Sequence, residues 1–181
     1  IKATRPFERV VHWCLALSSF LLCLTGMGTM YHSLNFIGAV IGGMANLRML
    51  HHYGGLFFSL SLLAAIAIFW KDAARFSLKE DWPWIKEAGG FLWQVEHIPE
   101  VGKCNPGQKM FFLVIALGGM AMLASGLIMW FPLSFGVGLV RTMYVVHSLG
   151  FLIIFAFVFV HLYLVTIGAP GSAPAMLTGW V

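Results

Sequence analysis

Two histidines, His147 and His161, lie inside a long apolar segment near the end of the chain. They are fourteen residues apart, so on an α-helix they are about 21 Å apart along the axis and point within roughly 40° of one another. One helix then presents two imidazoles on one face, one near each edge of a hydrocarbon layer about 30 Å thick. A polar side chain in lipid is costly, so each imidazole is expected to have a partner from another helix.

Three further histidines are candidate partners in the other apolar segments. His12 lies near the start of the first segment, and His51 and His52 begin the second. Because consecutive segments cross a bilayer in opposite directions, His51 or His52 lies at the depth of His147, and His12 lies at the depth of His161. His51 and His52 point about 100° apart on a helix, so only one of them can be a ligand, and periodicity alone does not select it.

Two imidazoles at each of two depths suit haem iron. Two histidines on one haem iron leave no open coordination position, which is typical of electron transfer rather than oxygen binding. Zinc needs three or four ligands at one level. The histidines therefore predict a cytochrome with two b-type haems stacked across the membrane. The alternative from a different class is a membrane anchor or small transporter without redox activity, in which the histidines relay protons or pack the core.

The elements that hold these histidines are four apolar segments, at residues 10–30, 49–70, 110–131 and 142–167. The chain is 60% hydrophobic and 10% charged, whereas soluble domains carry about 25% charged residues. Each segment is long enough to cross a bilayer as a helix, and no alternating strand pattern is present. The sequence therefore predicts an all-α integral membrane protein, with one membrane domain over residues 1–181 built as a four-helix bundle.

Positive charge is distributed unevenly among the loops. Of the eleven Lys and Arg residues, all but Arg48 and Arg141 either precede the first segment or lie in loop 71–109. By the positive-inside rule, both termini and loop 71–109 face the cytoplasm of a bacterium, and the chain crosses its inner membrane. The net charge of +4 follows from this topology and does not indicate nucleic-acid binding.

The loops differ in character. Loop 71–109 is the only sizeable polar stretch and is expected to dock a soluble partner. The exterior loop after the first segment is unusually apolar, which predicts either a short interfacial helix or a surface covered by a partner subunit. Arg48 and Arg141 could pair with propionates of the outer haem or merely mark helix ends. His32 and His97 are expected at the solvated surface.

Nearly the whole chain resembles the membrane cytochrome b (gamma) subunit of respiratory formate dehydrogenase. The stretches that carry the resemblance are ERVVHWCLALSSFLLCLTGMG, RMLHHYGG, VGKCNPGQKMFF and VVHSLGFLIIFAFVFVHLYL. The resemblance implies two b haems with axial ligands at His12, His51, His147 and His161, and it selects His51 over His52. It also implies an iron–sulfur (beta) subunit, a molybdenum- or tungsten-containing catalytic (alpha) subunit, and a complex that can form a higher oligomer.

The same resemblance implies quinone reduction beside the inner haem, with menaquinone or ubiquinone as substrate. Asn105 and Gly107 would contact the quinone, with Gln108 nearby and His161 as the adjacent haem ligand. An amide can hydrogen-bond a quinone carbonyl, and glycine lets the backbone approach a ligand closely. The alternative interpretation of the Asn105–Gly107 stretch is turn chemistry at the start of a helix.

Other enzymes could use a cytochrome b with the same ligand geometry. A subunit of a hydrogenase, of a thiosulfate reductase or of another molybdenum oxidoreductase is the alternative in the same class. The stretch NPGQK, residues 105–109, favours formate dehydrogenase. Lys103 and Lys109 could orient the quinone ring or assist proton delivery.

Overall fold

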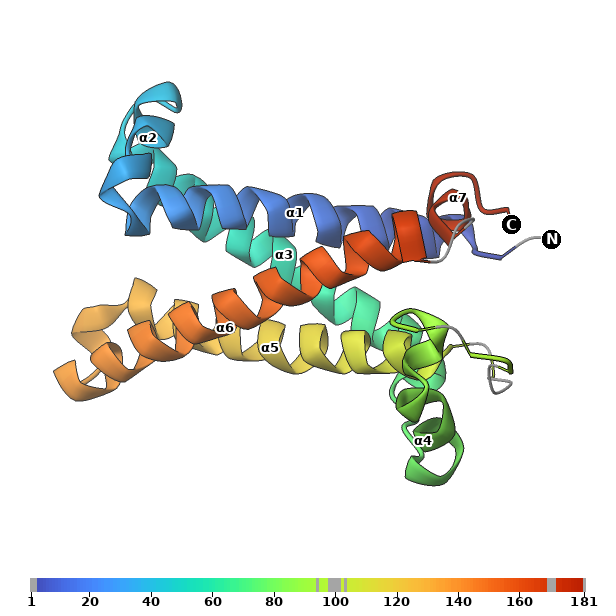
Figure 1. Ribbon diagram of the computed structural model, residues 1–181. Helices are drawn as coiled ribbons and strands as arrows, with labels where there is room; N and C mark the ends of the chain where they lie inside the picture. Colours follow the sequence, from blue (N-terminus) through green and yellow to red (C-terminus); the bar gives the residue numbers. More distant parts are fainter. Residues whose placement is uncertain (1–2, 94, 98–101, 103, 169–171, 181) are drawn as a thin grey trace.

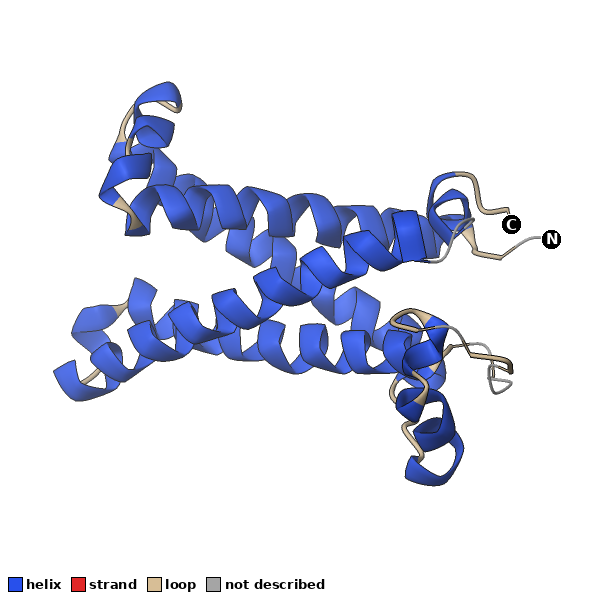
Figure 2. Ribbon diagram, viewed as in Figure 1, coloured by secondary structure: helices blue, strands red, loops and turns tan. Residues whose placement is uncertain are grey.

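The computed structural model of the chain describes residues 3–93, 95–97, 102, 104–168 and 172–180. Over these residues all the regular elements are helices (Figure 2). The long helices are α1 (Pro6–Met30), α3 (Met44–Ala73), α5 (Pro106–Trp130) and α6 (Val137–Tyr163). Each of them is long and apolar enough to cross a bilayer, so the predicted all-α membrane bundle is confirmed.

Short helices lie at the two ends of the bundle (Figure 1). One end carries η1 (His32–Leu34), α2 (Phe36–Val40) and η3 (Pro132–Ser134). The other carries α4 (Leu78–Lys86), η2 (Ala88–Gly90), α7 (Ser172–Leu177) and both chain termini, and η4 (Leu164–Gly168) continues α6 toward it. We call these the α2 end and the α4 end. The apolar loop after the first segment thus contains a short helix at the α2 end, and the described residues of polar loop 71–109 lie at the α4 end.

The long helices begin earlier than the segments expected from the sequence, and α3 also ends later. α1 begins at Pro6, because proline fits the first position of a helix, where its missing N–H is not needed. α3 begins at Met44, directly after a turn in which Gly42 and Gly43 adopt φ of 90° and 115°. Each expected segment begins directly after a Lys or Arg, whereas each helix begins before that charged residue.

The bundle consists of two antiparallel helix pairs. α1 packs on α3, α5 packs on α6, and contact between α3 and α5 joins the two pairs. At that contact Leu62 of α3, which is 1% exposed, fills the space that a side chain on Gly119 of α5 would need. Over the described residues of these helices, α6 is a close neighbour of α5 but not of α1 or α3. The contacts between α6 and the α1–α3 pair are therefore made by side chains and not by closely packed backbones.

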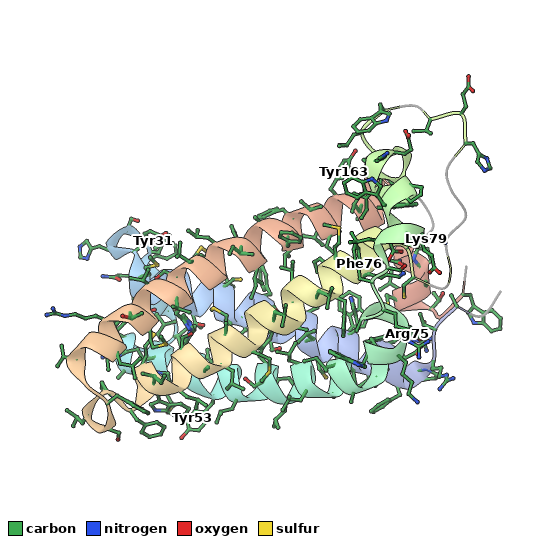
Figure 3. The ribbon with its side chains drawn as sticks, turned by 90° about the horizontal axis from the view of Figure 1, so that it is seen from below. Tyr31, Tyr53, Arg75, Phe76, Lys79 and Tyr163 are labelled. Carbon is green, nitrogen blue, oxygen red and sulfur yellow. The ribbon has the colours of Figure 1, made fainter. Side chains whose placement is uncertain are left out.

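The outer surface of the bundle is apolar. Large side chains such as Phe20, Leu60 and Leu117 are exposed on the long helices, as expected for surfaces that face lipid tails. Tyrosines lie toward both ends: Figure 3 shows Tyr31 and Tyr53 at the α2 end and Tyr163 at the α4 end. Aromatic residues at these two levels match the interfacial belts of a membrane protein.

Candidate functional site

Two pairs of imidazoles bridge α6 to the α1–α3 helix pair. At the α2 end, the ring centroids of His51 on α3 and His147 on α6 are 6.3 Å apart and the ring planes meet at 66°. At the α4 end, the ring centroids of His12 on α1 and His161 on α6 are also 6.3 Å apart, with planes at 49°. The structure thus brings together the two pairs expected from depth. We call them the α2-end pair and the α4-end pair.

The ring separation fits one metal ion between the two rings of each pair. An imidazole nitrogen lies about 2 Å from a bound metal and roughly 1 Å from its own ring centre, so two ligands on one metal place their ring centroids about 6 Å apart. Both pairs have this separation. Among the residues that the structure describes, no three His, Cys, Asp or Glu side chains come together as a metal site. Two protein ligands at each level suit haem iron, whose other four ligands come from the porphyrin.

A cavity of about 480 Å³ adjoins the α2-end pair. Its lining includes both imidazoles, with Arg48 one turn before His51 on the same helix. This volume lies within the range of cavities that hold cofactors, about 300–1,000 Å³. Glycines give the rings room: a Cβ on Gly26 would lie 3.2 Å from Cε1 of His51, and a Cβ on Gly126 would lie 3.4 Å from Cε1 of His147. The donor set, the ring separation and the cavity together fit a haem at this end.

Buried hydroxyl groups contact both imidazoles of the α2-end pair. Thr25 Oγ1 lies 2.9 Å from Nδ1 of His51, and Ser125 Oγ lies 2.9 Å from Nδ1 of His147. Each hydroxyl also donates to the main-chain carbonyl four residues earlier, at 2.8 Å for Thr25 and 2.7 Å for Ser125. Both side chains are at most 1% exposed. The sequence analysis missed them, and their only local signal is that each directly precedes a glycine in an apolar helix.

The α4-end pair has different neighbours. Nδ1 of His12 is buried and has no hydrogen-bond partner among the described residues. The ring of His161 stacks on Phe111 of α5, with centroids 4.5 Å apart and planes at 17°. A buried polar atom without a partner is uncommon and calls for an explanation. Nδ1 of His12 is therefore available to a group bound beside this ring.

The remaining histidines do not join either pair. His52 also lines the cavity at the α2 end, but its ring stacks on Trp130, with centroids 4.5 Å apart and planes at 30°. Nδ1 of His32 lies 3.0 Å from the side-chain nitrogen of Asn35 at the exposed surface. His97 is exposed. Of the two neighbours that periodicity could not separate, the structure therefore brings His51, and not His52, to His147.

Asn105, Gly107 and Gln108 lie together at the start of α5. The Asn105 side chain accepts a hydrogen bond from the backbone N–H of Gln108 at 2.8 Å, and the Gln108 side chain accepts one from that of Asn105 at 3.0 Å. This is a capping box, so the alternative interpretation of these residues as helix-start chemistry is present in the structure. The cap uses the side-chain oxygen of each amide, and neither NH₂ group takes part in the cap. A Cβ on Gly107 would lie 3.0 Å from the ring of Trp84, so α4 also packs closely here.

An ion pair fixes α4 to the same part of α5. Lys109 Nζ donates to Oδ1 of Asp81 at 2.8 Å, and the backbone N–H of Ser77 donates to Oδ2 at 2.8 Å. Burial raises the pKa of Asp81, but the hydrogen bonds from Lys109 and Ser77 and the lysine charge outweigh it, so the pKa lies below its ordinary value. Lys109 therefore holds α4 in place. Lys103, the other lysine considered for proton delivery, lies outside the described residues.

Comparisons with known proteins identify the family of the chain. A family model described as prokaryotic cytochrome b561 matches residues 3–179. A formate dehydrogenase cytochrome b556 subunit of Haemophilus influenzae is 27% identical over 181 residues, which cover 98% of this chain and 75% of that protein. The formate dehydrogenase cytochrome b556(fdo) subunit of Escherichia coli K12 is 26% identical over 184 residues, which cover 100% of this chain and 85% of that protein. The cytochrome b556(Fdn) subunit of the nitrate-inducible formate dehydrogenase of the same strain is 27% identical over 187 residues, which cover 100% of this chain and 84% of that protein. The resemblance drawn from the sequence is thereby confirmed.

Proposed function

The chain belongs to the prokaryotic cytochrome b561 family, and we propose that it is the membrane cytochrome b subunit of a formate dehydrogenase complex. In that role it passes electrons from an iron–sulfur partner subunit, fed by a molybdenum- or tungsten-containing catalytic subunit, to a membrane quinone. The observation that carries the proposal is the pair of two-histidine arrangements along α6, each with a ring separation of 6.3 Å. Formate dehydrogenase is proposed as the enzyme because the relatives are named as its cytochrome b556 subunits.

Two haem b groups are the cofactors of this proposal. When bound, haem b supplies a one-electron carrier. His51 and His147 would hold one group, and His12 and His161 would hold the other. With two histidines for each iron, the chain would leave no open position for oxygen and would suit electron transfer. Arg48, which lines the cavity beside His51, offers a positive charge to a haem carboxylate.

The quinone site of this proposal lies at the start of α5, beside the α4-end pair. Phe111 stacks on His161, which brings the first turns of α5 next to that pair. The amide NH₂ groups of Asn105 and Gln108 can donate to a quinone carbonyl while their oxygens keep the helix cap. The bundle is oriented with the α4 end toward the bacterial cytoplasm and the α2 end toward the outside, so quinone protons come from the cytoplasm. Menaquinone and ubiquinone both have the carbonyls that this site needs.

A cofactor and subunit inventory of the purified complex tests the function. We expect a reduced b-type absorbance band, two haems for each copy of this chain, an iron–sulfur subunit and a molybdenum or tungsten subunit active on formate. One haem per chain, or a hydrogenase or thiosulfate reductase in place of the formate-oxidising subunit, contradicts the proposal. A complex without haem supports a non-redox anchor instead.

Two substitutions of Asn105 test the quinone site while separating it from the helix cap. Asn105→Asp keeps an oxygen that accepts from Gln108 but removes the amide donor, and Asn105→Ala removes both. We expect quinone reduction to slow about tenfold in both, the equivalent of one lost hydrogen bond, with unchanged haem spectra and unchanged formate oxidation with an artificial acceptor. Asn46→Ala, which removes an exposed amide at the α2 end, is the control. A wild-type rate in Asn105→Asp removes this amide from the site.

A further inference from the structure

Two helices supply the hydroxyl groups at the α2-end pair, one for each imidazole. Oγ1 of Thr25 on α1 lies 2.9 Å from Nδ1 of His51, and Oγ of Ser125 on α5 lies 2.9 Å from Nδ1 of His147. We propose that Thr25 and Ser125 are positioning residues that set the tautomer and orientation of both axial ligands at this end, and so hold the potential of the α2-end haem low. This inference rests on the proposed function, because it assigns these hydroxyls a role toward the haem ligands.

The hydrogen-bond chain decides which ring nitrogen carries the proton. A hydroxyl has a single hydrogen, and in Thr25 and Ser125 it is directed to the carbonyl four residues earlier, at 2.8 and 2.7 Å. The oxygen is then an acceptor toward the imidazole, so Nδ1 of each ring donates to it. A proton on Nδ1 leaves the lone pair on Nε2 available to bind a metal.

The same residues fix the direction in which each ring points. Each hydroxyl is anchored to the main chain of its own helix, is nearly inaccessible to water and has one strong ring contact. A Cβ on the glycine that follows Thr25 would lie 3.2 Å from Cε1 of His51, and one on the glycine that follows Ser125 would lie 3.4 Å from Cε1 of His147, so the first position is the tighter. Each ring is therefore held at Nδ1 by a hydroxyl, and the two hydroxyls come from different helices.

This arrangement lowers the potential of the α2-end haem. A hydrogen bond from the outer nitrogen of a ligating imidazole makes the ligand more basic. A more basic ligand favours the oxidised iron, and hydrogen bonding around the ligands is one of the means by which proteins set haem potentials. His12 at the α4 end has no such partner for Nδ1 among the described residues. The difference favours electron flow from the α2 end to the α4 end, where the proposed quinone site lies.

A redox titration of the purified complex tests the inference, with each haem followed by its visible band and its low-spin electron paramagnetic resonance signal. Thr25→Val and Ser125→Ala each remove a hydroxyl with little change in volume. We expect the potential and the signal of one haem to shift, the potential upward, while the other haem is unchanged. Thr25→Ser keeps the hydroxyl and is expected to titrate as wild type. Ser18→Ala is the matched control, because among the described residues Ser18 is a buried serine of α1 that bonds only to main-chain carbonyls.

The outcomes separate this inference from the proposed function. Two haems per chain with unshifted potentials and signals in both Thr25→Val and Ser125→Ala would overturn the positioning role and leave the function standing. A wild-type complex without haem overturns both. If Thr25→Val loses one haem, the haem content of Thr25→Ser shows whether the hydroxyl is responsible. A haem retained in Thr25→Ser assigns the loss to the missing hydroxyl. Loss of the haem in Thr25→Ser as well overturns the inference.

Discussion

The two histidine pairs have the same ring separation, 6.3 Å, but different surroundings. The α2-end pair adjoins a cavity, and each of its rings contacts a hydroxyl that is anchored to a main-chain carbonyl. In the α4-end pair, one ring nitrogen of His12 has no partner among the described residues, and His161 lies flat on Phe111. The hydroxyls restrain the rings of the first pair. The second pair lies beside the polar start of α5 and the α4 helix that is anchored there, which is where the proposed function places the quinone.

The largest expected effect comes from removing one ligand of each pair. His147→Ala should lose the α2-end haem and His161→Ala the α4-end haem, so each variant keeps about half of the b-type absorbance, because one histidine does not hold a six-coordinate haem. Haem content per purified chain and the potential of the remaining haem measure this. His32→Ala, at the exposed surface, is the control. If one variant loses both haems, the two sites are not independent. If a variant loses neither haem, the substituted histidine is not a required ligand.

The next effect concerns the anchoring of α4 beside the α4-end pair. Asp81→Asn leaves the charge of Lys109 without its partner and should weaken the docking of α4 by about 2 kcal/mol. Faster hydrogen exchange of the α4 backbone amides measures this weakening. Glu80→Gln changes an exposed acid on the same helix and is the control. Equal exchange in wild type and Asp81→Asn would show that the ion pair does not hold α4.

Acidification should reproduce the effect of that substitution. Because the folded-state pKa of Asp81 lies below its ordinary value of 3.8, the stabilisation is fully present above pH 3.8 and is lost as the pH falls through the lower, folded-state pKa. We expect exchange of the α4 amides to rise at low pH in the wild type, relative to Asp81→Asn. An identical acid response in both proteins would assign the loss to another group.

The smallest effect should come from the aromatic contact at the α4 end. Phe111→Leu removes a ring stacked on His161, a contact of about 1 kcal/mol. We expect the resonance signal and potential of the α4-end haem to shift and those of the α2-end haem to stay unchanged. Phe112→Leu is the matched control, because the ring of Phe112 meets Trp70 instead. A shift in the α2-end haem would show that the two sites are not independent.

The pairing of the histidines could be predicted because the spacing of His147 and His161 fixes both their axial distance and their direction on one helix. The depth of each of these histidines in the membrane then leaves few histidines on the other helices as its partner. The bounds of the helices could not be predicted in the same way. Arg48 and Lys71 lie inside α3, because a helix that crosses a bilayer can continue into the interface, where charge costs little. The apolar pattern therefore locates the crossing but not the ends.

The hydroxyl contacts could not be predicted from the sequence. Serine in an apolar helix commonly bonds to a carbonyl one turn earlier, as Ser18 and Ser59 do here. Ser125, which also contacts an imidazole, differs from them locally only in the glycine that follows it, and this does not indicate such a contact. The ion pair of Asp81 and Lys109 joins residues 28 positions apart, and which charges meet depends on how α4 folds back on α5. Contacts of this kind depend on tertiary packing, which single-sequence patterns do not contain.

Both pairs depend on one helix, α6, which is the last of the four long helices in chain order. When α1, α3 and α5 of a nascent chain have entered the membrane, only one histidine of each pair is present there. Under the proposed function, neither haem would have both ligands until α6 enters the membrane, and a single event would complete both binding sites. Biogenesis of this cytochrome is therefore expected to load its cofactors late and together, with the empty three-helix intermediate as the species that assembly factors or proteases encounter.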